Sequence, residues 1–240
     1  MPNKLTILIP VFNEEGNLLR VEKELSNFIE SAKISSSVLF INDGSTDKSQ
    51  QLINDICARQ PRFNSISLDK NRGLSTALKA GIDFVNTEYV GYIDADLQTS
   101  PQDFNLLIPY IKNYALVTGI RSNRKDKFLK KMSSKIANSI RKLFTNDGVL
   151  DTGCPLKIMQ TSYAKQIPMF KGLHRFLPAM IQLQNGKVKQ VAVRHFPRMH
   201  GKGNFGFWNR SIGPLTDCFA FLWMRRKYIN YEIKYSSKPE

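Results

Sequence analysis

Three oxygen-bearing side chains lie close together in the segment GYIDADLQTS, which spans residues 91–100. Asp94, Asp96 and Gln98 occupy alternate positions directly after an apolar run that begins at Tyr89. In an extended chain, alternate side chains point to the same side, so the two carboxylates would face one place and repel each other. A hard divalent cation, with phosphate oxygens completing its coordination, would relieve that repulsion.

The same segment has a simpler explanation as a strand end that turns into a loop. Asp is common in turns, and Ser100 and Pro101 suit the N-cap and the first turn of a helix. A turn explains the sequence from Thr99 onward, but not the three oxygen donors together. These ten residues therefore leave a metal site and a polar turn both open.

The elements that must position these side chains are indicated by the first half of the chain. Short apolar, β-branched runs alternate there with segments of helical spacing, which predicts βαβ units and a doubly wound, mainly parallel α/β sheet. Ligands bind such sheets at the carboxyl ends of the strands. The predicted strands are residues 5–11, 37–43, 64–69, 89–96 and 114–120.

Four successive predicted strands have polar ends, which we expect to converge on one crevice. These ends are residues 10–14, 42–45, 69–73 and 94–96. Loops are polar in general, so ordinary turn chemistry is an alternative explanation. Neither GxGxxG after the first strand nor GxxxxGK[ST] occurs, which argues against a dinucleotide-binding domain and a P-loop NTPase.

Length and composition are those of an ordinary globular protein. The 240 residues suffice for one large domain, and we expect a single domain with two halves, residues 1–120 and 121–240. The three cysteines are widely spaced, which indicates a reducing compartment and neither a disulfide framework nor a zinc site. We find no signal-peptide pattern and no apolar run long enough to span a bilayer.

All of the excess positive charge lies in the second half. The net charge is +15, yet residues 1–120 carry −3 and residues 121–240 carry +18. This asymmetry predicts an anionic partner, which could be nucleic acid, a membrane surface or a phosphorylated substrate.

Two basic stretches of the second half also carry apolar side chains. Residues 121–145 contain nine Lys and Arg and one Asp, and residues 217–224 are followed by Arg225-Arg226-Lys227. Both fit helices in an anionic membrane interface, and both also fit surface helices packed on a core. A nucleic-acid face should instead interleave cations and stacking aromatics, so we expect no nucleic-acid partner. The apolar stripe of the first stretch recurs every fourth residue, at Phe128, Met132, Ile136, Ile140 and Phe144.

Together the motifs resemble those of the family 2 glycosyltransferases, which have the GT-A fold. Four motifs on consecutive strand ends carry this resemblance: PVFNE (10–14), NDGSTD (42–47), NRGLSTALKAGI (71–82) and DADLQ (94–98). Three later segments resemble the polyprenyl-phosphate branch, such as the dolichol-phosphate mannosyltransferases: DTGCPLK (151–157), GLHRFLP (172–178) and HFPRMHGKGNFGFWNR (195–210). The resemblance covers nearly the whole chain.

The resemblance implies a nucleotide-sugar donor, UDP- or GDP-linked, and a site for its nucleoside. Pro10, Phe12 and Glu14 would line the nucleoside pocket, and Asp43 would accept a hydrogen bond from the base. Asp94, Asp96 and Gln98 would be placed at a Mg²⁺ or Mn²⁺ ion and the diphosphate.

A later arginine would complete the catalytic set with the two aspartates. Arg198 matches the arginine of the family's R-x-x-G-x-S-K segment and would clamp the donor diphosphate. This chain has Gly203-Asn204 where Ser-Lys is usual. Lys202 would then supply the missing cation from a shifted position, or the donor is held differently.

The acceptor implied by the resemblance is a polyprenyl phosphate, undecaprenyl or dolichyl. Arg121, Arg124 and Lys131 align with basic residues that the family uses for the lipid phosphate. A phosphate monoester is already an anionic nucleophile, so single displacement with inversion needs no strong base. A sugar-hydroxyl acceptor would need a carboxylate base, and Asp151 is the obvious candidate in the second half. His174 fits either a structural role or a role at the acceptor site.

The expected location is cytoplasmic, at the periphery of the cytoplasmic face of a membrane. Two other functions stay open. One is a glycosyltransferase with a saccharide acceptor in cell-envelope polysaccharide synthesis. The other, from a different class, is a basic nucleic-acid-binding protein.

Overall fold

Strands and helices alternate through the first half of the chain, as its apolar runs predict. The computed structural model describes residues 3–121, 144–197, 207–231 and 234–235, without the side chains of 207–215. The elements of the first half are β1 (Leu5–Val11), α1 (Leu18–Ser31), β2 (Ser36–Asn42), α2 (Ser49–Arg59), β3 (Phe63–Ser67), α3 (Leu74–Phe84), β4 (Tyr89–Tyr92), η1 (Pro101–Asp103), α4 (Phe104–Leu107), η2 (Ile108–Tyr110) and β5 (Leu116–Arg121).

The second half adds two strands that the sequence did not predict, together with several helices. The predicted basic helix lies, for residues 122–143, outside the described part of the chain. The elements described in this half are β6 (Lys157–Gln160), α6 (Thr161–Lys165), η3 (Leu173–Arg175), α7 (Leu177–Leu183), β7 (Val188–Val193) and α8 (Phe207–Lys227).

The strands of the described residues form one seven-stranded sheet in the order β3-β2-β1-β4-β6-β5-β7. β1 pairs in parallel with β2 and β4, whereas β6 runs antiparallel to both β4 and β5. The expected doubly wound, mainly parallel α/β sheet is therefore confirmed. β2 and β3 are added to the sheet on one side of β1, and the next strand in the sequence, β4, is added on the other side. The carboxyl ends of β1 and β4 thus flank a topological switch point, where such sheets bind ligands.

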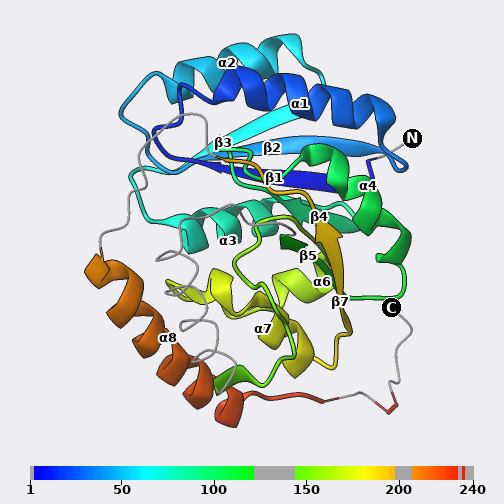
Figure 1. The fold of residues 1–240 in the computed structure, drawn as a ribbon, viewed down its shortest axis with the longest axis vertical. Helices are drawn as coiled ribbons and strands as arrows, with labels where there is room; N and C mark the ends of the chain where they lie inside the picture. The colour runs from blue at the N-terminus through cyan, green and yellow to red at the C-terminus, as the bar shows by residue number, and fades with distance from the viewer. Residues whose placement is uncertain (1–2, 122–143, 198–206, 232–233, 236–240) are drawn as a thin grey trace.

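Helices cover both faces of the sheet (Figure 1). Alternate residues of β1 explain why, because Ile7 and Ile9 pack with α1, α2 and α4, while Leu8 packs with α3, α6 and α7. α8 joins the second layer through Phe221, whose ring stacks on Phe176 at a centroid distance of 5.4 Å. Each such fully buried side chain contributes roughly 1.5–3 kcal/mol.

The strand predicted for residues 89–96 is shorter than expected, because β4 ends at Tyr92. Residues 94–98 form a turn instead, in which Leu97 has φ 45° and its N–H donates to the Asp94 carbonyl at 3.2 Å. The premise that Asp94, Asp96 and Gln98 alternate along an extended chain is therefore wrong. A turn can still bring the carboxylates together, because it folds the backbone back on itself.

The predicted helix start at residues 100–101 is partly confirmed. η1 begins at Pro101, but the Ser100 side chain makes no capping hydrogen bond. The Ser100 hydroxyl accepts a hydrogen bond from Arg194 Nη2 at 3.2 Å instead, so it ties the loop to the chain after β7.

Candidate active site

The loops that follow β1 and β2 are joined by reciprocal hydrogen bonds. The Asn13 N–H donates to Ser45 Oγ at 3.0 Å, and the Thr46 N–H donates to Asn13 Oδ1 at 2.8 Å. The Glu14 N–H donates to Ser49 Oγ at 3.0 Å. Asn13 has φ 54°, a conformation that Asn tolerates better than most residues. The PVFNE and NDGSTD motifs therefore form one continuous rim at the carboxyl edge of the sheet.

The three residues expected to line a nucleoside pocket lie on this rim. Pro10, Phe12 and Glu14 are each partly exposed at the end of β1. Glu14 Oε2 accepts a hydrogen bond from Asn17 Nδ2 at 2.5 Å, which holds the carboxylate at the start of α1. The sequence placed these residues on the edge correctly.

Asp43 directly follows β2, and its buried carboxylate holds the next loop. Its two oxygens accept the backbone N–H groups of Arg72 and Gly73, each at 2.8 Å. The neighbouring Gly44 has φ 67°, and a Cβ there would lie 2.4 Å from the carbonyl carbon of Lys70. The loops after β2 and β3 therefore approach so closely that only glycine fits at this position.

Asp94 and Asp96 lie together in the turn after β4, and their charges interact. Asp94 Oδ1 accepts a hydrogen bond from the Tyr92 hydroxyl at 2.5 Å, and Asp96 Oδ1 accepts one from the Gln98 N–H at 3.2 Å. Burial and then the charge of Asp96 raise the pKa of Asp94 to about 6. Two carboxylates are thus held near each other at the switch point, as the sequence predicts.

Lys157 is fully buried close enough to Asp94 for their charges to interact, and sequence reasoning missed it. It pairs with Tyr92 across β4 and with Thr118 across β5. Its ammonium donates to the carbonyls of Thr152 and Cys154, and burial lowers its pKa. Its positive charge lowers the pKa of Asp94, opposing the effect of burial. Its place in the DTGCPLK motif was the signal that could have drawn attention to it.

Arg121, predicted for the acceptor phosphate, ends β5 near the carboxylates. Its charge also lowers the pKa of Asp94. Its guanidinium makes a two-pronged ion pair with Asp151, Nε to Oδ2 at 2.8 Å and Nη2 to Oδ1 at 2.7 Å. The candidate base for a sugar-hydroxyl acceptor is therefore already engaged by this arginine.

His174 packs against α3 with a defined partner. Its Nδ1 lies 2.8 Å from Ser75 Oγ, which also accepts the Gly172 N–H at 3.1 Å. Burial, with the charges of Arg175 and Lys157, lowers the pKa of His174 to about 3. The imidazole is therefore neutral at physiological pH and holds η3 against α3, which is the structural role.

Gln98 is partly exposed at the far end of the turn. Its carbonyl accepts the Phe196 N–H at 2.8 Å and lies 3.1 Å from His195 Nδ1. The chain after β7 therefore anchors the carboxylate turn. The other predicted site residues, Arg124, Lys131, Arg198 and Lys202, lie outside the described part of the chain.

The charges of the turn indicate whether its residues could bind a divalent cation. Two carboxylates share a partly desolvated space, and their repulsion contributes to the raised pKa of Asp94. A cation between them would reverse that effect. Within the described residues no group of three or more His, Cys, Asp and Glu could hold a metal by itself. The two carboxylates therefore fit an open site in which substrate phosphates would provide further ligands.

Comparison with known families agrees with this geometry. Residues 6–167 match the family described as Glycosyl transferase family 2. The chain belongs to glycosyl transferase family 2. The expected membership is thus confirmed.

Two curated relatives of this family 2 protein are polyprenyl-phosphate sugar transferases by name, as the resemblance implied. Dodecaprenyl-phosphate galacturonate synthase of Rhizobium johnstonii is 28% identical over 229 residues, which cover 93% of this chain and 68% of the relative. Undecaprenyl-phosphate 4-deoxy-4-formamido-L-arabinose transferase of Edwardsiella ictaluri is 26% identical over 204 residues, covering 84% and 63%. The chain thus spans about two thirds of the length of these relatives.

Solved structures show the same fold. Glucosyl-3-phosphoglycerate synthase of Mycobacterium tuberculosis, in complex with Mn²⁺, UDP-glucose and phosphoglyceric acid, has a TM-score of 0.69 at 13% identity, covering 93% of this chain and 79% of its own. Its complex with Mg²⁺ and UDP has a TM-score of 0.69 at 14% identity, with the same coverage. The expected GT-A fold is confirmed by this likeness.

α8 presents an apolar and basic surface. Phe219 and Trp223 are 59% and 68% exposed, and the last turn carries Arg225, Arg226 and Lys227. Among the described residues, no helix combines the length and apolarity that crossing a bilayer requires.

Proposed function

We propose that this family 2 glycosyltransferase transfers a sugar from a nucleotide-sugar donor to a polyprenyl phosphate at a membrane surface, with inversion at the anomeric carbon. The observation that carries the proposal is the partly desolvated Asp94–Asp96 pair at the switch point, with the charge of Arg121 acting on it. The names of both curated relatives, each containing a polyprenyl phosphate, support the acceptor class.

The donor half, residues 1–120, would bind the nucleoside on the rim described above. Pro10, Phe12 and Glu14 are partly exposed there and available to line it. Each oxygen of Asp43 accepts one backbone N–H, and a carboxylate oxygen has a further lone pair for an N–H of the base. The donor would be UDP- or GDP-linked.

Asp94, Asp96 and Gln98 would hold Mg²⁺ or Mn²⁺, the ions present in the solved complexes of the structural neighbour. When bound, the cation neutralises charge that develops on the departing nucleoside diphosphate. Arg198 and Lys202 would clamp the same diphosphate. Tyr92 would orient Asp94, because its hydroxyl donates to that carboxylate.

The acceptor half, residues 121–240, would bring a phosphate monoester to the anomeric carbon. Arg121, Arg124 and Lys131 would hold this anion beside the donor diphosphate, since two anions approach only where cations offset their repulsion. The ion pair between Asp151 and Arg121 favours a phosphate nucleophile, because it leaves Asp151 poorly placed to accept a proton from a hydroxyl.

The location we propose is the cytoplasmic periphery of a membrane. The exposed aromatic side chains of α8 and the cations of its last turn suit the boundary between acyl chains and anionic headgroups. The +18 charge of residues 121–240 would add attraction to that surface.

The test is nucleoside diphosphate release from a panel of UDP- and GDP-sugars, with Mg²⁺ or Mn²⁺, in the presence and absence of polyprenyl phosphate in detergent. We expect release that depends on the lipid phosphate and is lost in Asp96→Asn. The variant should keep its fold, because Asp96 lies in a turn outside the sheet.

Two results would argue against the proposal. Hydrolysis of the donor that lipid phosphate does not accelerate would favour a saccharide acceptor. Near-normal turnover by Asp96→Asn would remove Asp96 from the cation site.

A further inference from the structure

Residues 194–196, which leave the sheet at the carboxyl end of β7, cross to the loop that follows β4. β5 and β6 lie between β7 and β4 in the sheet, so the two strands are about 14 Å apart at the usual strand spacing. Arg194 nevertheless contacts Asp103, 91 positions earlier in the chain. This crossing segment, residues 194–196, therefore ties the second half of the chain to the loop that carries the carboxylate turn.

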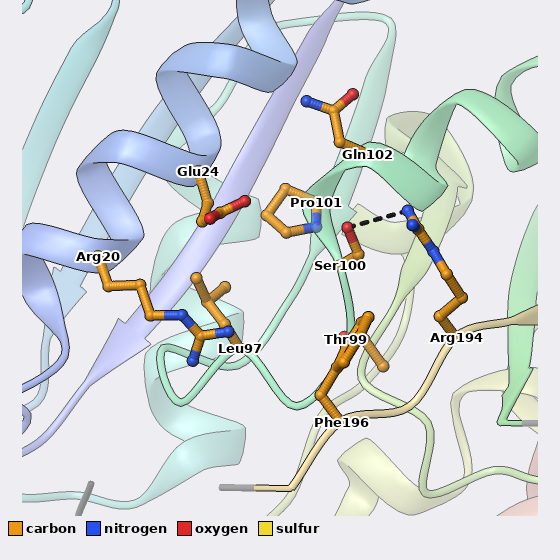
Figure 2. Close-up of a pocket in the computed structure, with 9 residues that line it drawn as sticks. All are labelled: Arg20, Glu24, Leu97, Thr99, Ser100, Pro101, Gln102, Arg194 and Phe196. Atoms are coloured by element: carbon orange, nitrogen blue, oxygen red, sulfur yellow. Dashed lines mark hydrogen bonds between the residues drawn. The ribbon is translucent and has the colours of Figure 1, made fainter. Parts of the chain in front are cut away.

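Arg194 holds this loop mainly through one buried carboxylate. Its backbone N–H donates to Asp103 Oδ2 at 2.7 Å, while its Nε and Nη2 donate to Oδ1 at 2.8 and 2.6 Å. Nη2 also donates to the Ser100 hydroxyl, as Figure 2 shows. The Asp103 side chain is only 3% exposed, so these donors offset the cost of removing its charge from water. Both the backbone and the side chain of Arg194 are thus fixed to the loop.

The two residues after Arg194 carry this restraint to the carboxylate turn. The Phe196 N–H donates to the Gln98 carbonyl at 2.8 Å, and His195 Nδ1 lies 3.1 Å from the same oxygen. The Gln98 N–H in turn donates to Asp96 Oδ1 at 3.2 Å. The backbone of Gln98 therefore links the crossing segment to the Asp96 carboxylate, and a shift of the segment would displace that carboxylate.

We propose that Arg194 is a positioning residue for the cation site, because it holds the loop whose turn presents the Asp94–Asp96 pair. The inference rests on the proposed function, in which these carboxylates bind Mg²⁺ or Mn²⁺. It predicts an effect opposite in sign to that of charge alone. A positive charge near a cation site weakens cation binding through its field, so removing the charge should strengthen binding. Loss of positioning should weaken it instead.

The test measures Mn²⁺ affinity by calorimetry, with UDP present at one fixed concentration. Arg194→Gln should bind Mn²⁺ about tenfold or more weakly than the wild type, the usual effect of removing a residue that orients a metal ligand. Arg194→Lys keeps the charge but cannot form the two-pronged pair with Asp103, so it should also bind Mn²⁺ more weakly. If Arg194→Gln does not fold, Arg194→Lys decides.

Arg59→Gln is the matched control, because Arg59 makes the same kind of two-pronged pair elsewhere. Its half-exposed guanidinium donates to both oxygens of the largely buried Glu22 carboxylate. Arg59 ends α2, which leads into the start of β3, so this pair lies at the opposite edge of the sheet. Arg59→Gln removes an equal charge and should leave Mn²⁺ affinity unchanged. Hydrogen–deuterium exchange of residues 97–103 should accelerate in Arg194→Gln and not in Arg59→Gln.

The outcomes separate this inference from the proposed function. If the wild type binds Mn²⁺ and Arg194→Gln binds it equally or more tightly, the positioning role is overturned and the cation site stands. An equal loss of affinity in Arg59→Gln would also overturn it, because the effect would then follow general stability. A wild type that binds no Mn²⁺ would refute the proposed cation site and the inference together.

Discussion

Asp94 carries a proton more readily than an ordinary carboxyl group, so cation binding at this site should depend on pH. Its pKa is raised to about 6 in the cation-free protein. Mn²⁺ binds the carboxylate form, so we expect its affinity to fall progressively below about pH 6, approaching tenfold per pH unit. Calorimetry near pH 6 in two buffers of different ionisation enthalpy should detect protons released on binding. An affinity that does not change between pH 5 and 7 would contradict the assignment of Asp94.

Because of this raised pKa, ionised Asp94 destabilises the folded protein when no cation is bound. The folded protein holds a proton that the unfolded chain, with an Asp pKa near 4, releases between about pH 4 and 6. The free energy of unfolding therefore falls as pH rises through this window, by up to about 3 kcal/mol. We expect Asp94→Asn to unfold at a higher temperature than the wild type at pH 7 in chelator, although it binds Mn²⁺ poorly. Equal unfolding temperatures would show that the buried Asp94 carboxylate does not destabilise the folded protein.

Lys157 should influence the pH at which Asp94 titrates. Its buried ammonium lowers the pKa of Asp94, so Lys157→Met should move the midpoint of pH-dependent Mn²⁺ binding upward. The same calorimetric titration at several pH values measures this shift. Lys79→Met is the control, because it removes an equal charge from a partly exposed site on α3, where Lys79 pairs with Asp83, and it should leave the midpoint unchanged. An unchanged midpoint in Lys157→Met would mean that Lys157 only donates hydrogen bonds to the carbonyls of the loop before β6 and does not affect the titration of Asp94.

Residue type and position were enough to predict some of these groups and not others. Asp43, Asp94 and Asp96 follow apolar runs, and the topology of parallel strands places them on one edge. Lysine is almost never fully buried without a partner, so no sequence rule favours Lys157 as a core residue. Arg121 and Asp151 form an ion pair although they lie 30 positions apart. Nothing in the sequence around either residue indicates that the two would meet.

At the scale of elements, the loops after β2 and β3 depend on their close approach at Gly44. Gly44→Ala should destabilise the protein by more than about 3 kcal/mol, because the added carbon collides with backbone that cannot move aside. Gly148 provides a matched control, since its φ of 66° is nearly the same and no atom lies within 4 Å of a Cβ there. Gly148→Ala should cost only the conformational strain, about 1 kcal/mol. Chemical denaturation measures both; equal losses would show that the loop approach carries no penalty.

The elements themselves were predictable to different degrees. The first five strands carry long β-branched runs, and their positions agree with the structure within a few residues. β4 was predicted too long because Ile93 and Ala95 continue its apolar run into the turn. β6 and β7 are short, and Lys157, Lys189 and Gln190 interrupt their apolar character. Tertiary pairing, more than local preference, makes these two segments strands.

For the whole molecule, the exposed aromatics of α8 predict how it meets a membrane. Replacing Phe219 and Trp223 together with Ser should reduce sedimentation with anionic liposomes at least tenfold, because two apolar side chains no longer insert. Phe84→Ser is the control, since Phe84 is 58% exposed on α3 at another part of the surface. Undiminished liposome binding by the double variant would assign attachment to charge alone.

The position of β6 has a consequence for how the chain acquires its fold. β6 pairs with β4 on one side and β5 on the other, although it follows both in sequence. During synthesis, one edge of β4 therefore stays unpaired until residue 160 has left the ribosome. Until then β5 has no strand to pair with. Unpaired edges of this kind are where nascent chains aggregate, and long-range pairings are slow to form. The growing chain is therefore most in need of chaperone protection between the completion of β4 and the arrival of β6.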